Sequence, residues 1–252
     1  MKDTTIFGSL DPELMDQVVS RRGAVSRTGK MAGVLAVASM PVAFGLMAKR
    51  AFAQGTGLPA GIVAVLNFAL TLEYLEDEFY RLGLDSGVIP SEDEPIFTTI
   101  SLHEAAHVAL LTGAITTGGG TPVTAPTFDF TAGGAFDPFG TYADFQALSQ
   151  GFEDTGVRAY KGQAGALIAN DEILTTALRI HSVEARHASA VRRLRGRKGW
   201  ITGNETDVPA LAPVYAGEEA GAGVTTAASA EAFDEPLTME QVNAIAGLFI
   251  LA

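Results

Sequence analysis

The residues best suited to chemistry form a four-residue pattern, Glu-x-x-His, that occurs twice in the chain. Glu104 and His107 make the first copy, and Glu184 and His187 make the second. In an α-helix, residues three positions apart lie on the same face, so each copy would direct a carboxylate and an imidazole toward one point. Both groups are ligands of divalent transition metals. Either copy alone is an ordinary surface or core pair, so only its combination with further residues indicates a site.

A lone glutamate stands at the same distance before each copy of the pattern. Glu73 precedes Glu104 by 31 positions, and Glu153 precedes Glu184 by 31 positions. The first half therefore maps onto the second with an offset of 80 residues, as two helical hairpins related by a pseudo-twofold axis would require. We expect one bundle core to bring together six metal ligands, which are Glu73, Glu104, His107, Glu153, Glu184 and His187.

Other acidic residues lie close to the two lone glutamates and compete with them as ligands. Glu76 and Glu78 belong to the same predicted helix as Glu73, and Asp154 directly follows Glu153. We prefer Glu73 and Glu153 because only these two fit the repeat. The three competitors remain alternatives at this point.

Four further side chains are placed to support the ligands. Tyr80 and Tyr160 share the 80-residue offset, and His181 lies one helical turn before Glu184 on the same face. We expect these three to hydrogen-bond the ligands, with His181 as an additional ligand in one alternative. Ordinary core packing with satisfied polar groups is the other alternative. His103 points about 100° away from Glu104, which favours a supporting or interface role.

The composition restricts the choice of metal. The chain contains no Cys, so thiolate sites and disulfides are excluded. Carboxylate and imidazole ligands favour iron or manganese, with zinc as a third option. Four carboxylates would balance the charge of two divalent ions. Without metal, four buried glutamates would repel one another, and several should take up protons.

Length and charge bound the class of protein. The chain has 252 residues, 47% of them hydrophobic, which suits one globular domain with appendages. The formal net charge is −12, and the part after residue 53 alone carries −15. Nucleic-acid binding is excluded because it requires a basic surface. Nothing in the sequence specifies an oligomeric state.

Apolar periodicity predicts an all-α fold in which four helices position these residues. We expect helices over about 59–83, 95–113, 142–162 and 171–194, with a Gly/Thr/Pro-rich loop over 116–138 between the second and third. Two antiparallel hairpins joined by a long crossover make a four-helix bundle over residues 54–198. The remaining segment, 199–252, reads as a loop-rich tail that packs on the bundle. A capping-box pattern at Thr238 predicts a short helix near its end.

Residues 1–53 are typical of an export signal. Ser20-Arg21-Arg22 precedes an apolar run from Met31 to Met47, and Ala51-Phe52-Ala53 has the small-x-small form of a cleavage site. The segment resembles a bacterial twin-arginine signal, which implies the twin-arginine translocase as a partner. It also implies cleavage after Ala53 and a periplasmic or extracellular location. An uncleaved membrane anchor is the alternative, although the run is short for a bilayer of about 30 Å and contains Pro41.

Several segments together resemble the ferritin-like domain family, which includes desiccation-related proteins of resurrection plants and many exported bacterial proteins. The resemblance extends from about Leu58 to Phe249 and rests on LNFALTLEYLEDEFYRLG, HEAAHVALL, FEDTGVRAY, HSVEARHASAVR and AFDEPLT. The hairpins are more distantly similar to rubrerythrin, bacterioferritin and manganese catalase. The resemblance implies that Glu104 and Glu184 bridge two metals. It also implies that Glu73 and Glu153 are terminal ligands, and that one histidine binds each metal.

The expected function is therefore that of an exported ferritin-like protein with a dinuclear iron or manganese centre. Its reaction would be redox chemistry with O₂ or peroxide, as in a ferroxidase or a catalase-like enzyme. A non-enzymatic stress or desiccation protein with a structural metal site is the alternative. A ferritin-type storage cage is a third interpretation, with less support because the long loop and tail would have to fit a shell.

Overall fold

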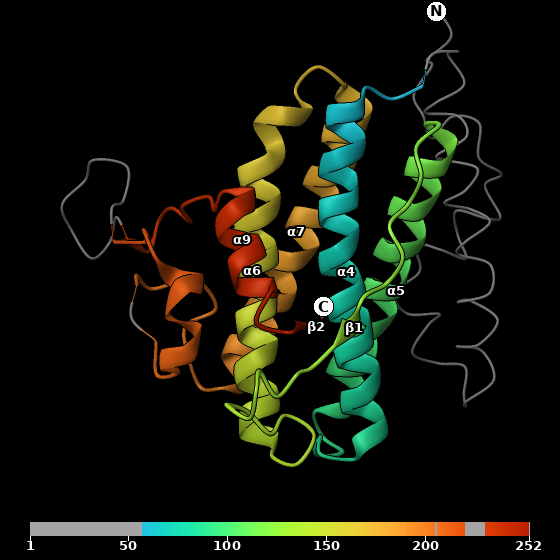
Figure 1. Ribbon diagram of the computed structural model, residues 1–252. Coiled ribbons are helices and arrows are strands. Elements are labelled where there is room, and N and C mark those ends of the chain that lie inside the picture. Colours follow the sequence, from blue (N-terminus) through green and yellow to red (C-terminus); the bar gives the residue numbers. More distant parts are fainter. Residues whose placement is uncertain (1–56, 205, 220–229, 252) are drawn as a thin grey trace, which may run out of the picture. The chain divides into compact units, whose positions relative to one another are not determined.

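Two antiparallel helical hairpins form the framework of the structure (Figure 1). The computed structural model describes residues 57–204, 206–219 and 230–251. The first hairpin consists of α4 (Ala60–Ser86) and α5 (Glu94–Thr117), and the second consists of α6 (Tyr142–Leu167) and α7 (Asp171–Leu194). The hairpins pack against each other mainly through α4 and α6. The predicted four-helix bundle is therefore confirmed.

Three of the four helices extend beyond the glycines at which we expected them to end. Helix α4 continues through Gly83. This glycine serves close packing, because a Cβ atom there would lie only 2.1 Å from the Phe145 ring. Helix α6 likewise continues through Gly162, where a Cβ atom would lie 1.9 Å from the backbone oxygen of Leu237. The residue that does end α4 is Gly87, which adopts the left-handed conformation with φ of 71°.

Side-chain caps fix where the second hairpin begins. Thr141 Oγ1 accepts a hydrogen bond from the Asp144 amide at the start of α6, and Asn170 Oδ1 accepts one from the Ile173 amide at the start of α7. These caps fix the residue at which each helix begins, and with it the direction in which the ligands of that helix face. Helix α7 begins at Asp171, the residue at which the sequence predicted its start.

The crossover between α5 and α6 runs along the bundle and joins the end of the chain (Figure 1). Its strand β1 (Thr127–Phe128) pairs antiparallel with β2 (Ile250–Leu251), with Thr127 opposite Leu251. Asn67 on α4 holds the preceding part of the loop, because its side chain accepts from the Val123 amide and donates to the Thr121 carbonyl. This strand pair was not predicted, since two residues leave no periodic signal.

The tail packs on the outer side of α6. It contains the 3-10 helix η1 (Pro209–Tyr215) and α9 (Met239–Ala246), and α9 begins with the predicted capping box between Thr238 and Gln241. Figure 1 shows α9 lying against α6.

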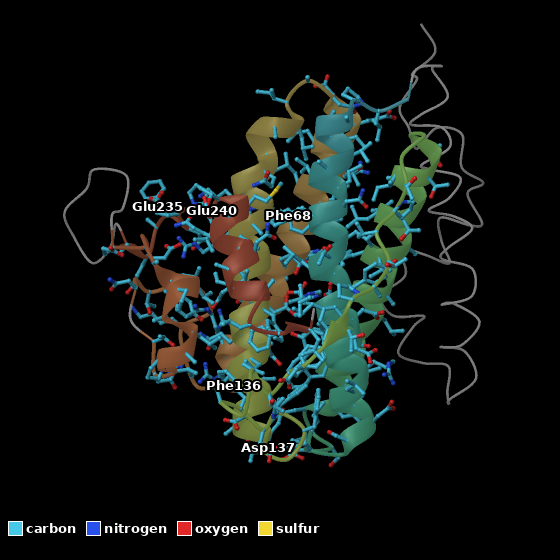
Figure 2. All side chains as sticks on the ribbon, in the orientation of Figure 1. Phe68, Phe136, Asp137, Glu235 and Glu240 are labelled. Carbon is cyan, nitrogen blue, oxygen red and sulfur yellow. The ribbon has the colours of Figure 1, made fainter. Side chains whose placement is uncertain are left out.

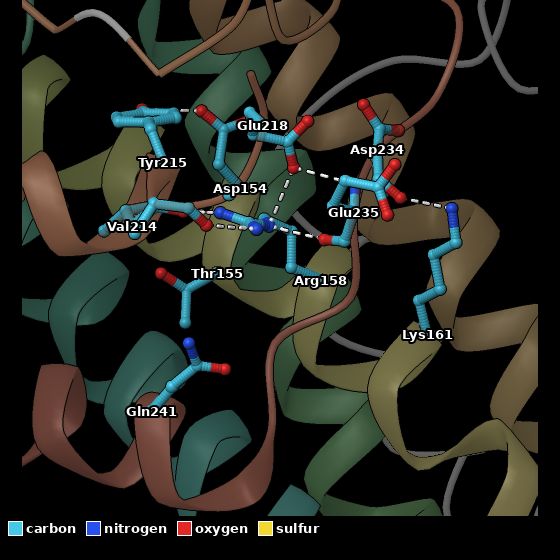
Figure 3. Close-up of polar contacts among 12 residues, drawn as sticks. Asp154, Thr155, Arg158, Lys161, Val214, Tyr215, Glu218, Asp234, Glu235 and Gln241 are labelled. Carbon is cyan, nitrogen blue, oxygen red and sulfur yellow. Dashed lines mark hydrogen bonds and ion pairs between the residues drawn. The ribbon is translucent and has the colours of Figure 1, made fainter. Parts of the chain in front are cut away.

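Arg158, on α6 and only 1% exposed, binds the tail by donating to the carbonyls of Val214, Ala216 and Glu235 (Figure 3). Its guanidinium also pairs with Glu218, at 2.8 Å from Nε to Oε1. One buried cation thus holds two separate stretches of the tail.

Buried apolar side chains form two clusters, one toward each end of the bundle, and side chains fill the space between the helices (Figure 2). The larger cluster is rich in phenylalanine and includes tail residues such as Phe249, which packs on Phe136 and Phe152. The smaller cluster is aliphatic and occupies the other end. Along each helix, the predicted metal ligands lie between the residues of the two clusters.

The predicted export segment 1–53 lies outside the described residues. Within the part of the chain that the structure describes, none of the helices combines the length and the apolar composition that crossing a membrane requires.

Candidate metal centre

The bundle core brings together the six predicted ligands, from all four helices. Glu73 comes from α4, Glu153 from α6, and one Glu-x-x-His pair each from α5 and α7. The four glutamates are 0% exposed, and the histidines are 7% and 5% exposed. The six residues form two overlapping groups in which ligand atoms lie within 4.8 Å of one another. Glu104 and Glu184 belong to both groups, so they lie between two candidate metal positions.

His107 directs its Nδ1 atom at three carboxylates. This nitrogen lies 2.9 Å from Glu104 Oε2, 3.1 Å from Glu73 Oε2 and 3.2 Å from Glu184 Oε1. These oxygens come from α5, α4 and α7. One imidazole nitrogen thus faces the point where three helices deliver a carboxylate.

His187 occupies the corresponding position in the second half. Its Nδ1 atom lies 2.9 Å from Glu104 Oε1 and 3.2 Å from Glu153 Oε2. Neither contact has the geometry of a hydrogen bond, because this nitrogen has no hydrogen-bond partner among the described residues. Nitrogen and oxygen lone pairs therefore converge without a proton aligned between them, as ligands of a shared cation would.

Several buried oxygens of the cluster also have no hydrogen-bond partner within the described chain. These are Glu104 Oε1, Glu153 Oε2 and both carboxylate oxygens of Glu184. Leaving a buried polar group unpaired costs about 1–3 kcal/mol, and more when the group is charged. A cation bonded to these oxygens would remove that cost. The residues present therefore fit the metal ions that the sequence pattern predicts.

The protonation of the cluster shows the same need for positive charge. Burial, with the charges of neighbouring glutamates, raises the pKa of Glu184 well above its usual value and that of Glu104 to about 7. Burial lowers the pKa of His187, but the charges of Glu153 and Glu104, which lie close to its Nδ1 atom, outweigh burial and raise the pKa to about 11. In the absence of metal, protons supply the charge that the carboxylates require.

Tyr80 and Tyr160 hydrogen-bond the ligands crosswise. Tyr80 is on α4 and donates to Glu153 of α6, at 2.5 Å, whereas Tyr160 is on α6 and donates to Glu73 of α4. Each tyrosine therefore supports the lone glutamate of the opposite hairpin. The remaining oxygen of each glutamate stays directed at the centre.

His103 supports one ligand from outside the cluster. Its Nδ1 atom lies 2.9 Å from Nε2 of His187, and the two rings stack with centroids 5.1 Å apart. Burial lowers the pKa of His103 to about 4, so it is neutral and can accept a hydrogen bond from His187. With Nε2 held by this bond, Nδ1 of His187 faces the carboxylates and would be the nitrogen that binds a metal after losing its proton. The sequence indicated a supporting or interface role for His103, and the structure gives its partner.

His181 is not brought into the cluster. It lies one turn from Glu184 on α7, but its Nδ1 atom has no hydrogen-bond partner within the described residues. Its pKa is lowered by burial and influenced by the Val157 backbone, Lys161 and Asp234 rather than by the ligands. Three residues fall short of a full helical turn, so the His181 side chain is rotated away from Glu184 and toward α6.

The competing acids occupy three different environments. Glu78 is partly exposed and pairs with Arg81 at 2.7 Å. Asp154 is buried, but Arg192 on α7 binds both of its oxygens, and the Tyr215 hydroxyl donates to one of them. Glu76 is 3% exposed and lies near the ligands, where burial and the charges of four glutamates raise its pKa well above the usual value. The repeat did not indicate that Glu76 would be buried beside the ligands.

Comparison with known families agrees with this geometry. Residues 61–197 match the family model described as a ferritin-like domain, and this range contains all six predicted ligands. Among curated proteins, no sequence matches the chain.

Proposed function

The chain belongs to the ferritin-like domain family, and from that premise we propose that its core binds a dinuclear iron or manganese centre that reacts with dioxygen or peroxide. The observation that carries the proposal is the pair of overlapping ligand groups, each with its own histidine and both sharing Glu104 and Glu184. Two groups with shared carboxylates suit two metal ions held close together. Zinc would fit the same ligand types but would supply no redox chemistry.

Charge balance supports two ions. Glu73, Glu104, Glu153 and Glu184 supply four negative charges when ionised, and two divalent ions neutralise them. The histidines bind as neutral imidazoles and add no charge.

The resident metals would supply electrons. Redox-active divalent ions held by these residues would provide the two electrons that, with two protons, reduce one H₂O₂ to two H₂O. The protein's own residues hold the ligand carboxylates in place, through the two tyrosines, and exclude bulk water from the cluster. A ferroxidase and a catalase-like enzyme share these requirements, and the substrate distinguishes them.

A non-enzymatic function is the second candidate, favoured by the burial of the cluster. All six residues are at most 7% exposed, so a metal here would stabilise the bundle even without turnover. The protein would then be a stress or desiccation protein whose metals hold the four helices together.

Export completes the proposal. The twin-arginine-type segment 1–53 would send the chain to the periplasm or the outside after folding, with its metals already bound. A buried site assembled from all four helices can be filled before translocation only if the protein is exported folded.

Metal analysis of the chain, isolated after passage through its own export pathway, tests the proposal. We expect about two Fe or Mn per chain in the wild type and less than one in Glu104→Gln and Glu184→Gln. Glu78→Gln is the matched control, because Glu78 is a partly exposed glutamate of α4 whose ion-pair partner among the described residues is Arg81. Fewer than one metal per chain in the fully helical wild type would contradict the metal site.

Turnover separates the two candidate functions. Rapid peroxide or dioxygen consumption that Glu104→Gln abolishes and Glu78→Gln retains supports the redox enzyme. Two bound metals without any consumption support the structural function.

A further inference from the structure

A small cavity lies between α4, α6 and α9, next to the ligand cluster. Its walls include Leu72 and Glu76 from α4, Thr155 and Gly156 from α6, and Ile245 and Ala246 from α9. Its interior has room for only about one or two water-sized molecules. The cavity combines an apolar outer wall on α9 with polar groups on the side of the bundle.

Gly156 connects this cavity to the ligands. A Cβ atom at this position would lie 3.1 Å from Glu184 Oε2 and 3.5 Å from Glu184 Cγ. Any other residue would therefore fill the space between the cavity and this carboxylate. Both oxygens of Glu184 have no hydrogen-bond partner within the described residues, so the glycine in the cavity wall also lies against an unpaired ligand carboxylate.

Glu76 gives the cavity its chemical character. It is 3% exposed. Burial raises its pKa most, and the charge of Glu184 raises it further, followed by those of Glu153, Glu104 and Glu73. Together with the Thr155 side chain, it supplies hydrogen-bonding groups to a chamber that is otherwise apolar. Such a chamber suits a small molecule that donates and accepts hydrogen bonds.

We propose that this cavity is the chamber through which a polar oxidant of the size of hydrogen peroxide reaches the metal centre, and that α9 excludes bulkier hydroperoxides. The inference rests on the proposed function, because it presupposes metals at the ligand cluster. It adds to that function the route by which the oxidant reaches the metals, the side of the bundle on which it enters and an upper limit on its size. It also gives the tail a function beyond packing, since Ile245 and Ala246 form the outer wall.

A second cavity offers a competing route. It lies among the four helices on the other side of the cluster. Mainly apolar side chains such as Ala69 and Ala177 line it, together with Tyr160, Gln163 and Thr176, and no acidic residue is among them. An apolar chamber suits dioxygen better than peroxide. It approaches the ligands at Tyr160, whose hydroxyl already donates to Glu73. The cavity at Gly156 instead has the Glu76 carboxyl group in its wall, and Gly156 itself lies against the Glu184 carboxylate, which favours this cavity as the route for a polar molecule.

Filling the cavity from α9 tests the route without touching a ligand. Ala246→Leu places three additional carbons in the chamber, and Ala244→Leu is the matched control, because Ala244 lies on the exposed face of the same helix. We measure the metal content of the full chain and the dissociation constant of azide, a small polar anion, for the metal-loaded protein. Both variants should keep about two metals, while Ala246→Leu weakens azide binding at least tenfold and Ala244→Leu leaves it unchanged.

The outcomes distinguish the two proposals. A wild-type chain without metal overturns the proposed function, and the inference falls with it. Metal-loaded Ala246→Leu with wild-type azide affinity overturns the inference alone. Ala177→Leu fills the apolar cavity and should leave azide binding unchanged, so weaker binding in that variant would assign access to the other route.

Widening the chamber gives an independent test if Ala246→Leu does not fold. Ile245→Ala removes side-chain volume from the outer wall. The wild type should consume hydrogen peroxide at least tenfold faster than tert-butyl hydroperoxide, and Ile245→Ala should reduce that ratio at least threefold with unchanged metal content. An unchanged ratio in the metal-loaded variant would contradict exclusion by α9.

Discussion

At the scale of single residues, the two halves of the ligand cluster present the same kinds of atoms to the centre. They differ in the residues that hold those ligands in place. Both histidines present Nδ1 to glutamates from several helices, and both lone glutamates accept from a tyrosine of the opposite hairpin. Only His187 is held by a further histidine, His103. The residue that corresponds to His103 in the second half is Val183, which cannot hydrogen-bond His107. The two candidate metal positions are therefore inequivalent.

This asymmetry predicts a selective effect of His103→Ala. Removing the acceptor of the His187 Nε2 proton frees the ring to rotate and to change tautomer, which typically weakens metal binding about 10–100-fold. Calorimetric titration with Fe²⁺ or Mn²⁺ should show one site at wild-type affinity and one weakened by about that factor. His181→Ala is the control and should leave both sites unchanged. Equal weakening of both sites in His103→Ala would contradict the inequivalence.

At the scale of elements, the glycines of α6 illustrate why helix ends were predicted too early. Glycine is typical of helix ends, but it also occurs where another segment approaches closely. At Gly162 the tail backbone lies against α6, and the amide of Leu237 donates to the Arg158 carbonyl one turn earlier. Sequence pattern alone does not distinguish these two uses of glycine.

Two substitutions in α6 should therefore have opposite effects on stability. Gly162→Ala places a Cβ atom 1.9 Å from the Leu237 oxygen and must displace the tail, so we expect a loss of about 2 kcal/mol or more. Gly165→Ala meets no described atom within 4 Å and should stabilise the helix by about 0.5–1 kcal/mol. Urea unfolding measures both. Similar free energies of unfolding for the two variants would show that the tail does not pack tightly on α6.

At the scale of the whole molecule, the metal would be part of what makes the bundle stable. The ligand cluster separates two apolar clusters, so the charged layer lies in the middle of the core rather than at its edge. Positive charge in this layer comes either from protons or from metal ions. Metal binding must therefore displace protons, and acid must weaken metal binding.

This competition predicts a stability that depends on both metal and pH. Metal at about 100 times its dissociation constant adds about 2.7 kcal/mol, which corresponds to a rise in Tm of about 5–10 °C for a chain of this size. Burial raises the pKa of Glu104 to about 7 in the metal-free protein, so lowering the pH from 8 to 6 protonates this ligand and should reduce the rise in Tm. Calorimetry with and without chelator at both pH values measures the effect. Glu104→Gln is the control and should show a much smaller metal-dependent rise at either pH.

The sequence by itself determined the ligand types, their spacing and the fold that could unite them. Two Glu-x-x-His patterns and two lone glutamates in register were sufficient, because helical periodicity ties position in the chain to position on a face. The Gly/Thr/Pro-rich stretch predicted the crossover, and the residue pattern at Thr238 predicted the capping box of α9. The signal was strong because it repeated over 80 residues.

The tertiary structure alone decided which neighbours act on the ligands. The tyrosines bond across hairpins rather than along their own helix, and His103, rather than His181, contacts a ligand. It also showed Glu76 and Gly156 beside one cavity and α9 as its outer wall. These relations depend on the rotation and the separation of packed helices. A period of 3.6 residues specifies the face of a helix, but the side chains between two helices decide what that face meets.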